Sequence, residues 1–567
     1  MKTRYRFWII CLLITAMADA SEVPPYNVYA DMAQVTVDGR GAIASVNSMA
    51  TELGMQAFAK GGNALDAAAA VAFGLGVVDT ANSGIGGGCF ILVHWADGTV
   101  EAIDGREMAP AAATREMFSV AGEYQPALSK TGALAIGVPG SVAALEYVLK
   151  KGGKLGWKNA ILPAANLAES GFKIGPTYHH RLSRVVDRMK MFPASATTFL
   201  DENGRARAIG ETFQQPELAN TYRKLAEQGS QYFYQGEFAQ QVAAWMKANK
   251  GIVTAEDFAA YTVLQRTPVT STFNGYDIVG FPPPSSGGAH VAQILNMMAL
   301  YPLDKLTEVE RYHLAIESMK RAFADRAYWM GDADFVDVPK GLVEKSYAKQ
   351  LASTINLNKA TAVLSHGTPP AATTHLFNRH TTHIAVADAD GNWVAMTTTL
   401  NTTFGSKVTI PGSGVVMNNQ MDDFAAQAGK ANAFGLLGDS ANRVQPRKRP
   451  LSSMSPTIVL KNGKPVVTIG AAGGPTIINQ VVQGLVNRLV LDLPYEEALS
   501  RPRVHHQWQP DRVLIDPSAS DELRAGLEKR GHELVTWPGF GSAQMLGLEK
   551  GKFVAVAEPR LEARAKR

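Results

Sequence analysis

Two stretches near the start of the chain have the pattern of buried helices. Ser48, a residue type that caps helices, precedes the helical pattern of residues 49–60, and Ala64–Val77 has small or apolar residues on every side. A helix that is apolar all round is normally buried. The glycine-rich segment Ser83–Phe90 then leads into the apolar run Ile91–Trp95, which predicts a strand preceded by a loop of close backbone approach.

The C-terminal third alternates with a period of two instead. Thr382, Ile384 and Val386 alternate with other residues up to the turn Asp390-Gly391, and Trp393–Thr403 returns as a β-branched strand. A second strand pair is predicted at Ser455–Leu460 and Val466–Ile469, joined by Asn462-Gly463. Because helical patterns such as Thr307–Tyr328 come before this strand-rich part, the chain is predicted to form a layered α/β or α+β fold.

The first twenty residues have the three parts of a secretory signal. Three basic residues precede the apolar run Phe7–Met17, and Ala18-Asp19-Ala20 resembles a cleavage site before Ser21. An uncleaved membrane anchor is the alternative, but the apolar run is shorter than the ~20 residues that span a bilayer. We therefore expect residues 1–20 to be removed, leaving a periplasmic or secreted protein with no membrane anchor.

Composition narrows the classes of protein further. The chain has 567 residues, 46% of them hydrophobic, which argues against disorder, and its formal charge of +4 includes no basic tail for nucleic acid. It has only two cysteines, and loss of the signal removes one of them, Cys11. No disulfide can then form within the mature chain, and Cys89 is expected to be a buried, inert thiol.

Common catalytic motifs do not occur. The chain lacks the phosphate-binding G-x-x-x-x-G-K-[ST], the zinc-binding H-E-x-x-H and the nucleophile elbow G-x-S-x-G, and Cys89 stands where a dinucleotide fingerprint needs its third glycine. The pairs His179-His180 and His505-His506 are poor shared metal ligands, because adjacent side chains point apart. No metal or organic cofactor is predicted.

The remaining signal is a set of segments rich in Thr, Ser, Asn, Gln and Gly. Composition alone would make them ordinary strands and turns. Together and in this order, however, they resemble the signature segments of gamma-glutamyltranspeptidases: residues 61–68, 83–90, 104–106, 282–288, 380–383, 400–405, 418–424, 449–456 and 502–507. The resemblance covers nearly the whole mature chain.

This resemblance implies a fold and a maturation step. Members of the family are N-terminal-nucleophile hydrolases with a four-layer αββα sandwich, an α+β fold, and their precursors cut themselves before a threonine. The matching bond here is His380–Thr381, which implies a large subunit of residues 21–380 and a small subunit of 381–567 in one intertwined catalytic domain. Cleavage frees an α-amine with a pKa near ~8, a suitable base for a threonine hydroxyl. The precursor is expected to be inactive.

The resemblance also assigns roles to individual residues. Thr381 is the expected nucleophile and Thr399 the residue whose hydroxyl orients it, while backbone N–H groups of Gly473 and Gly474 are expected to form the oxyanion hole. The substrate's α-carboxylate and α-ammonium need fixed donors and acceptors. The residues expected to hold the carboxylate are Arg106, Ser452 and Ser453, and those expected to hold the ammonium are Asn401, Gln420 and Asp423.

The implied reaction transfers a gamma-glutamyl group from glutathione or a related amide through an ester on Thr381. Water, or an amino acid or dipeptide acceptor, would resolve the ester. Two departures from the family pattern bear on this reaction. Phe434 lies in the segment Ala428–Asp439, which matches a lid loop, and it stands where bacterial members have tyrosine. Pro475-Thr476 stands where other members often have serine and arginine. Two alternatives remain, a cephalosporin or glutaryl acylase of the same fold and an unprocessed binding protein for gamma-glutamyl peptides.

Overall fold

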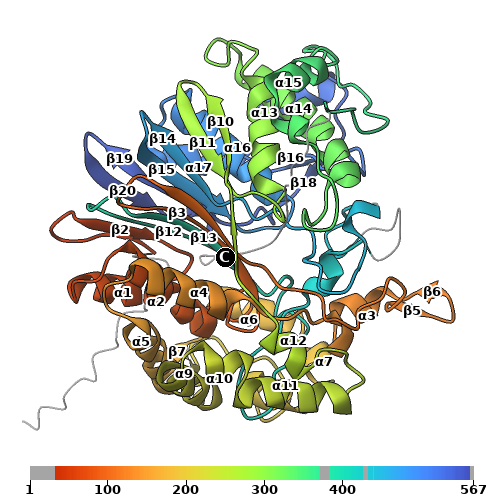
Figure 1. Ribbon diagram of the computed structural model, residues 1–567. Coiled ribbons are helices and arrows are strands. Elements are labelled where there is room, and N and C mark those ends of the chain that lie inside the picture. The colour runs from red at the N-terminus through yellow and green to blue at the C-terminus, as the bar shows by residue number, and fades with distance from the viewer. Residues whose placement is uncertain (1–31, 371–381, 426–431, 439, 562–567) are drawn as a thin grey trace, which may run out of the picture.

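The structure, a computed structural model, describes residues 32–370, 382–425, 432–438 and 440–561. Two β-sheets lie face to face at its centre, and helices cover the outer face of each sheet (Figure 1). The predicted four-layer αββα sandwich is therefore confirmed. No helix in these described ranges is long and apolar enough to cross a membrane.

The first sheet combines strands from both sides of the predicted cleavage point. Within the described residues its strands are antiparallel throughout and follow the order β1 (Ala33–Val35), β2 (Gly41–Ala44), β12 (Thr382–Asp388), β13 (Trp393–Thr399), β3 (Gly88–His94), β4 (Val100–Gly105) and β9 (Leu264–Arg266). The hairpin β12–β13 thus lies between β2 and β3, two strands that precede it by about 300 residues. Backbone hydrogen bonds of the sheet would hold the two halves together after a cut.

The second sheet faces the first and is also antiparallel. Its order is β10 (Val269–Phe273), β11 (Tyr276–Gly280), β14 (Thr457–Lys461), β15 (Lys464–Ala471), β19 (Ala543–Glu549) and β20 (Lys552–Val556). In the part of the chain that the structure describes, three smaller sheets lie outside the two central ones: β5 (Ser119–Val120) with β6 (Glu123–Tyr124), β7 (Phe172–Lys173) with β8 (Thr212–Phe213), and β16 (Val504–His505), β17 (Val513–Ile515) and β18 (Leu534–Thr536).

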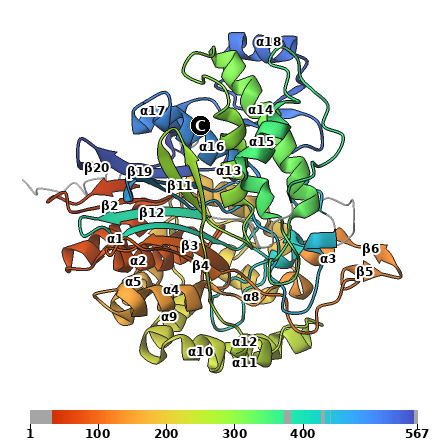
Figure 2. The same cartoon turned by 45° about the horizontal axis from the view of Figure 1, so that its top comes forward.

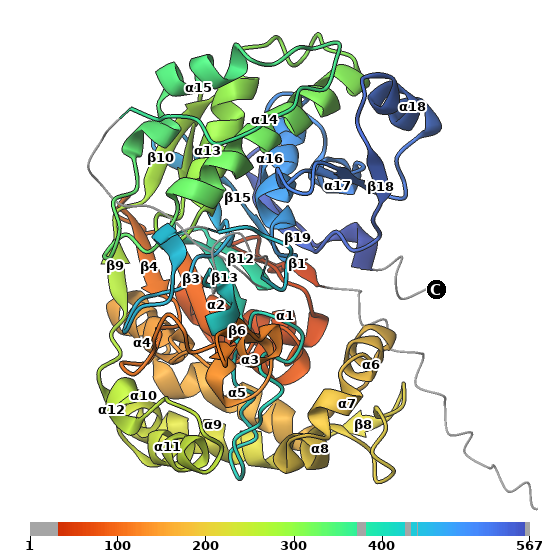
Figure 3. The ribbon, with the colours of Figure 1, turned by 90° about the vertical axis from the view of Figure 1, so that its right-hand side faces the viewer.

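The helices separate into two layers, one for each sheet (Figure 2, Figure 3). The layer on the first sheet contains α1 (Ser48–Ala59), α2 (Ala64–Val78), α4 (Ser141–Gly152), α5 (Trp157–Ser170), α6 (Pro176–Ser183), α7 (Val186–Met189), α8 (Pro193–Phe199), α9 (Pro216–Gln228), α10 (Ser230–Tyr234), α11 (Glu237–Ala248) and α12 (Ala255–Ala259). The layer on the second sheet contains α13 (Gly287–Met298), α14 (Glu308–Trp329), α15 (Lys345–Ala352), α16 (Thr476–Leu489), α17 (Tyr495–Ser500) and α18 (Asp521–Lys529). The short helix α3 (Pro126–Lys130) lies beside the 3-10 turns Ala133–Ala135 and Gln420–Asp423.

Alternation along the central strands decides which side chains lie between the sheets. In β12, Ile384 and Val386 belong to the core under the first helical layer, whereas Ala385 and Ala387 belong to the core between the sheets. Alanines and large apolar side chains share this inner core, and Phe90 of β3 stacks on Phe281 across it, with ring centroids 4.1 Å apart. Both faces of the predicted hairpin are therefore buried, which explains its β-branched and alanine-rich composition.

His383 lies at this inner surface and is fully buried. Its Nδ1 is 3.2 Å from the Thr397 hydroxyl, and its ring occupies the space where any side chain at Gly470 of β15 would lie. Burial lowers the pKa of His383 to about 3. The imidazole is consequently neutral in the folded protein at neutral pH.

Acid should destabilise the fold through this histidine. Because its pKa is lowered from 6.5 to about 3, its contribution is present above pH 6.5 and is lost as the pH falls below that value. We expect the free energy of unfolding to drop by about 2 kcal/mol between pH 7 and pH 5 from this group alone. Chemical denaturation at both pH values would measure it. His383→Gln should reduce the drop, whereas the same change at the exposed His180 should not.

Two predicted boundaries need correction. Asn47, not Ser48, caps α1, because its side chain accepts a hydrogen bond from the N–H of Met49. The returning strand β13 ends at Thr399 rather than Thr403, since Asn401 adopts a φ of +80° and the chain leaves the sheet. The second correction places Thr399 at the end of a central strand.

Candidate active site

Thr399 lies at the end of β13, between the two sheets. Thr398 pairs with Thr382 of β12, and Thr399 pairs with Gly88 of β3 on the other side. The glycine loop before β3 passes very close here: a Cβ at Gly87 would lie 1.8 Å from the carbonyl oxygen of Thr399. The close backbone approach predicted for this loop is confirmed. Thr381, the predicted nucleophile, and His380 lie outside the described residues.

Asn401 follows in a turn that its own conformation produces. Its positive φ brings its N–H to the Thr399 hydroxyl at 2.7 Å, and its side-chain Nδ2 donates to the carbonyl oxygen of Asn419 at 2.9 Å. Asn tolerates this left-handed conformation better than most residues do. Asn401 therefore ties Thr399 to the segment that carries Gln420 and Asp423.

Arg106, Gln420 and Asp423 meet in a buried cluster. Arg106 follows directly after β4, and its Nη2 donates to Asp423 Oδ2 at 2.7 Å, while Gln420 Nε2 donates to the same oxygen at 2.7 Å. The side chains of Arg106 and Asp423 are both fully buried. The arginine predicted for the carboxylate and the aspartate predicted for the ammonium thus bind each other. A zwitterionic substrate offers each of them a new partner of the correct charge.

Ser452 and Ser453 lie beside this cluster. Pro450, two residues before Ser452, accepts a hydrogen bond from Arg106 Nε at 3.2 Å, and both serines are fully buried. The backbone oxygen of Ser452 accepts from the N–H and the hydroxyl of Ser286 at 3.1 and 2.8 Å. The loop at residues 282–288 therefore positions this pair next to the arginine.

Gly473 and Gly474 come from the second sheet, where they link β15 to α16. Both have positive φ, +124° and +66°, and Gly473 is exposed while Gly474 is buried. In the described residues neither N–H donates a hydrogen bond. Since the following helix presents its positive end here, these groups are suited to stabilise a developing negative charge.

The site contains two charged residues for which the sequence analysis predicted no role. Burial raises the pKa of Glu107 to about 7, although Arg106 beside it opposes the shift. Burial lowers the pKa of Arg326 in α14 to about 9, against the opposing charge of Asp423. Glu107 directly follows the segment 104–106, which matches the family pattern, so its position in the sequence was a signal for a role in the site. Arg326 lies in a helix without any motif, and only its burial reveals it.

The structure describes two further features singled out in the sequence, Cys89 and the segment around Phe434. Cys89 is fully buried, as expected, and burial together with the Glu107 carboxylate raises the pKa of its thiol. The segment Ala428–Asp439 is described only from 432 to 438, where Phe434 packs against the core of the second layer. Gln507 Nε2 donates to the carbonyl oxygen of Gly435 at 3.0 Å, which fastens this part of the segment to the body of the protein.

One group in the described residues has the composition of a metal site, but its contacts do not suit a cation. His313, Glu317 and His532 are buried with their ligand atoms within 4.8 Å of one another. Glu317, however, already pairs with Arg321 at 2.9 Å and with Lys320 at 3.2 Å, and His313 Nδ1 is 2.7 Å from His532 Nε2. Two cations and a histidine pair make this a closed polar network.

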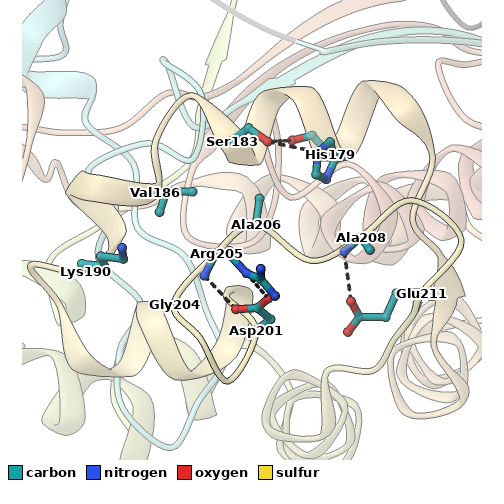
Figure 4. Close-up of a pocket in the computed structure, with 10 residues that line it drawn as sticks. All are labelled: His179, Ser183, Val186, Lys190, Asp201, Gly204, Arg205, Ala206, Ala208 and Glu211. Carbon is teal, nitrogen blue, oxygen red and sulfur yellow. Dashed lines mark hydrogen bonds and ion pairs between the residues drawn. The ribbon is translucent and has the colours of Figure 1, made fainter.

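A hollow of about 610 Å³ lies elsewhere, on the first helical layer (Figure 4). Its lining comes from α6, from residues near α7 and from the loop around residues 201–211, where Arg205 pairs with Asp201 at 3.0 Å. None of the predicted site residues that the structure describes lines it. The hollow is therefore separate from the cluster around Arg106.

Two stacked sheets between helical layers, with Thr399 at the end of an inner strand, define the class of protein. It has the fold of the N-terminal-nucleophile hydrolases. The family model for gamma-glutamyltranspeptidase matches residues 50–566. The chain belongs to the gamma-glutamyltranspeptidase family, and it is an enzyme.

Individual relatives agree with this assignment. The chain is 39% identical to the glutathione hydrolase proenzyme of Escherichia coli over 98% of its own length and 97% of the relative's, and 35% identical to that of Bacillus subtilis over 98% and 97%. A cephalosporin acylase structure from Bacillus halodurans matches with a TM-score of 0.84 at 28% identity, covering 92% of this chain and 94% of its own. A gamma-glutamyltranspeptidase structure from Helicobacter pylori matches with a TM-score of 0.55 at 41% identity, covering 56% of this chain and 92% of its own.

Proposed function

We propose that this protein cleaves itself before Thr381 and then hydrolyses or transfers the gamma-glutamyl group of glutathione and related amides. The observation that carries the proposal is the buried cluster of Arg106, Gln420 and Asp423, which offers opposite charges within hydrogen-bond distance of each other. A gamma-glutamyl group carries both an α-carboxylate and an α-ammonium. The cluster matches that pair of charges.

The pairing of β12 with β13 supports Thr381 as the nucleophile. Thr382, the residue that follows Thr381 in the chain, pairs with Thr398, which directly precedes Thr399. The described part of the small subunit therefore begins at the strand end that carries Thr399. The freed amine would take the proton of the Thr381 hydroxyl, and Thr399 would orient that hydroxyl.

The reaction then proceeds through an ester. The Thr381 oxygen attacks the γ-carbonyl carbon, the N–H groups of Gly473 and Gly474 stabilise the oxyanion, and the amine leaves with a proton. Arg106, Ser452 and Ser453 hold the α-carboxylate. Water, or an amino acid or dipeptide, resolves the ester in the second half of the reaction, which should produce ping-pong kinetics.

The same proposal covers maturation and location. Residues 1–20 act as a signal peptide, and cleavage gives subunits of 21–380 and 381–567 that stay interleaved in the first sheet. Export to the periplasm, or release outside the cell, follows from the signal.

A second candidate function is acylase activity on cephalosporin or glutaryl substrates, favoured by the TM-score of 0.84 to the Bacillus halodurans acylase. Glutaryl substrates lack the α-ammonium. When such a substrate binds, it offers no positive charge to pair with the buried Asp423 carboxylate, and an unpaired buried charge is costly. We therefore place this activity second.

One experiment tests both steps of the proposal. The full chain is expressed, the mass of each polypeptide is measured, and the purified protein is assayed with gamma-glutamyl and glutaryl anilides. We expect a smaller polypeptide that begins at Thr381 and faster turnover of the gamma-glutamyl anilide. A stable uncut chain would contradict self-cleavage, and faster turnover of the glutaryl anilide would favour the acylase.

Replacing Gly473 by alanine tests the oxyanion hole. Its φ of +124° disfavours any side chain, and an added Cβ would lie 2.7 Å from Thr476 Oγ1 and 2.9 Å from Gly541 Cα. We expect Gly473→Ala to lower kcat by about 10²- to 10³-fold with little change in KM. The matched control is Gly463→Ala, where φ is +74° but nothing lies within 4 Å. Equal kcat values for the two processed variants would remove Gly473 from the oxyanion hole.

A further inference from the structure

Arg326 is a buried cation without a hydrogen-bond partner. Its side chain is among the largest that are fully buried, and its Nε has no acceptor. Within the described residues no hydrogen bond or ion pair is formed by its guanidinium group. A buried guanidinium left unpaired is unfavourable, because the charge loses its hydration and gains nothing in return.

Other buried arginines in the described chain are paired. Arg321, one helical turn earlier in α14, donates to Glu317 at 2.9 Å and to the hydroxyl of Thr354 at 2.7 Å. Arg449 pairs with Asp104 at 2.6 Å, and Arg503 pairs with Glu558 at 2.7 Å. Arg326 thus differs from them in its missing partner, although it is equally buried.

The end of α14 lies against the predicted substrate-binding segments. A Cβ at Gly331 would lie 2.2 Å from the carbonyl oxygen of Ala441, and Asp332 accepts a hydrogen bond from the N–H of Arg449 at 2.7 Å. Asn442, next to Ala441, donates to the backbone oxygen of Asp423 at 2.7 Å. The chain just after α14 therefore packs on the segments that hold Asp423 and Ser452. The helix itself contacts the turn Ser440–Asn442, and Arg326 lies in its last turn, on the side of the molecule where these segments meet.

The guanidinium of Arg106 is not entirely free to bind a substrate carboxylate. Its guanidinium already contacts Asp423, Pro450 and Glu107. The charge of Asp423 is also the one that favours the cationic form of Arg326, and with a pKa of about 9 Arg326 is protonated at neutral pH. The cluster consequently has a second, uncommitted positive charge.

We propose that Arg326 binds the α-carboxylate of the gamma-glutamyl donor, so that two arginines rather than one recognise this group. The inference rests on the proposed function and names a further specificity-determining residue of the same site. When donor binds, its carboxylate supplies the hydrogen-bond acceptors that Arg326 lacks, and its ammonium takes over the Asp423 carboxylate from Arg106. This exchange leaves no charge of the cluster unpaired.

The test compares two donors and three variants. Arg326→Gln removes the charge, Arg326→Lys keeps it without the planar fork, and Arg321→Gln is the matched control on the same helix. Each is assayed with a gamma-glutamyl anilide and with its α-carboxamide analogue, per amount of processed enzyme. We expect Arg326→Gln to lower kcat/KM about 10- to 100-fold for the carboxylate donor, mainly through KM, and less than threefold for the carboxamide. Arg326→Lys should recover part of the loss.

The possible outcomes separate the two levels of the proposal. If the wild-type enzyme turns over neither donor, the proposed function fails. If it is active but Arg326→Gln lowers kcat/KM equally for both donors, Arg326 has only a structural role and the inference is wrong. A third outcome is a loss confined to the second step, in which the acceptor resolves the ester. If Arg326→Gln slowed this step with an amino acid acceptor but not with the corresponding amino acid amide, Arg326 would bind the acceptor carboxylate, and the inference would be wrong. The inference would also be wrong if neither Arg326 variant cleaved itself while Arg321→Gln did.

Discussion

Thr381→Ala should yield a single uncut polypeptide with no measurable gamma-glutamyl transfer. The substitution removes the hydroxyl that is expected to attack the His380–Thr381 bond, and with that bond intact the nitrogen of residue 381 stays an amide and cannot act as a base. Loss of both nucleophile and base should reduce turnover by at least about 10⁴-fold. Mass measurement and an anilide assay on the purified protein would show both effects.

The neighbouring threonine provides the control for this experiment. The Thr382 hydroxyl points to the other face of β12, where it lies 3.1 Å from Asp79 Oδ2 under the first helical layer. Thr382→Ala should still process and should retain most of the activity. Cleavage of Thr381→Ala at the normal position, or full activity without cleavage, would contradict the assignment of Thr381.

Asp423→Asn should abolish most gamma-glutamyl activity without a comparable effect on substrates that lack the α-amine. The change removes the charge that faces the donor ammonium and deprives the buried Arg106 of its ion pair at 2.7 Å. Because the buried ammonium of the donor would then meet no opposite charge, we expect kcat/KM for the gamma-glutamyl anilide to fall about a thousandfold. Turnover of the glutaryl anilide, however slow, should change less than tenfold.

Asp422→Asn is the matched control, one residue away. Its carboxylate accepts from the Ser129 hydroxyl at 2.6 Å and from the N–H of Ala433 at 2.9 Å. These contacts fix α3 and the segment at 432–438 and do not involve Arg106. A smaller loss is expected from this variant, and equal losses at the two positions would argue against a direct contact between Asp423 and the donor ammonium.

The hairpin shows how far local sequence determines this fold. Alternation in Thr382–Val386, the Asp390-Gly391 turn and the β-branched return predicted both strands, which form as β12 and β13. Backbone geometry and side-chain alternation are local properties, so they are readable from neighbouring residues. The end of β13 was not readable, because it depends on the positive φ of Asn401 and on a bond to Asn419, eighteen residues away.

The site residues had to be taken from the family pattern. Arg106 and Asp423 are 317 residues apart, and nothing local to either indicates that they form a buried ion pair. The segments around them resemble those of gamma-glutamyltranspeptidases, and this resemblance alone assigned both residues to one predicted site. Their mutual hydrogen bond, which makes the donor's charges a matched replacement, is visible only in the folded chain.

The sequence by itself therefore determined the layered α and β elements, the buried hairpin and, through resemblance, the family and most of the proposed site. Tertiary structure alone decided that strands from before and after residue 380 share one sheet, and that Arg326 is buried with no hydrogen-bond acceptor for its Nε. The physical reason is the range of the interactions. Alternation and turns depend on adjacent residues, whereas burial and charge pairing depend on segments that only folding brings together.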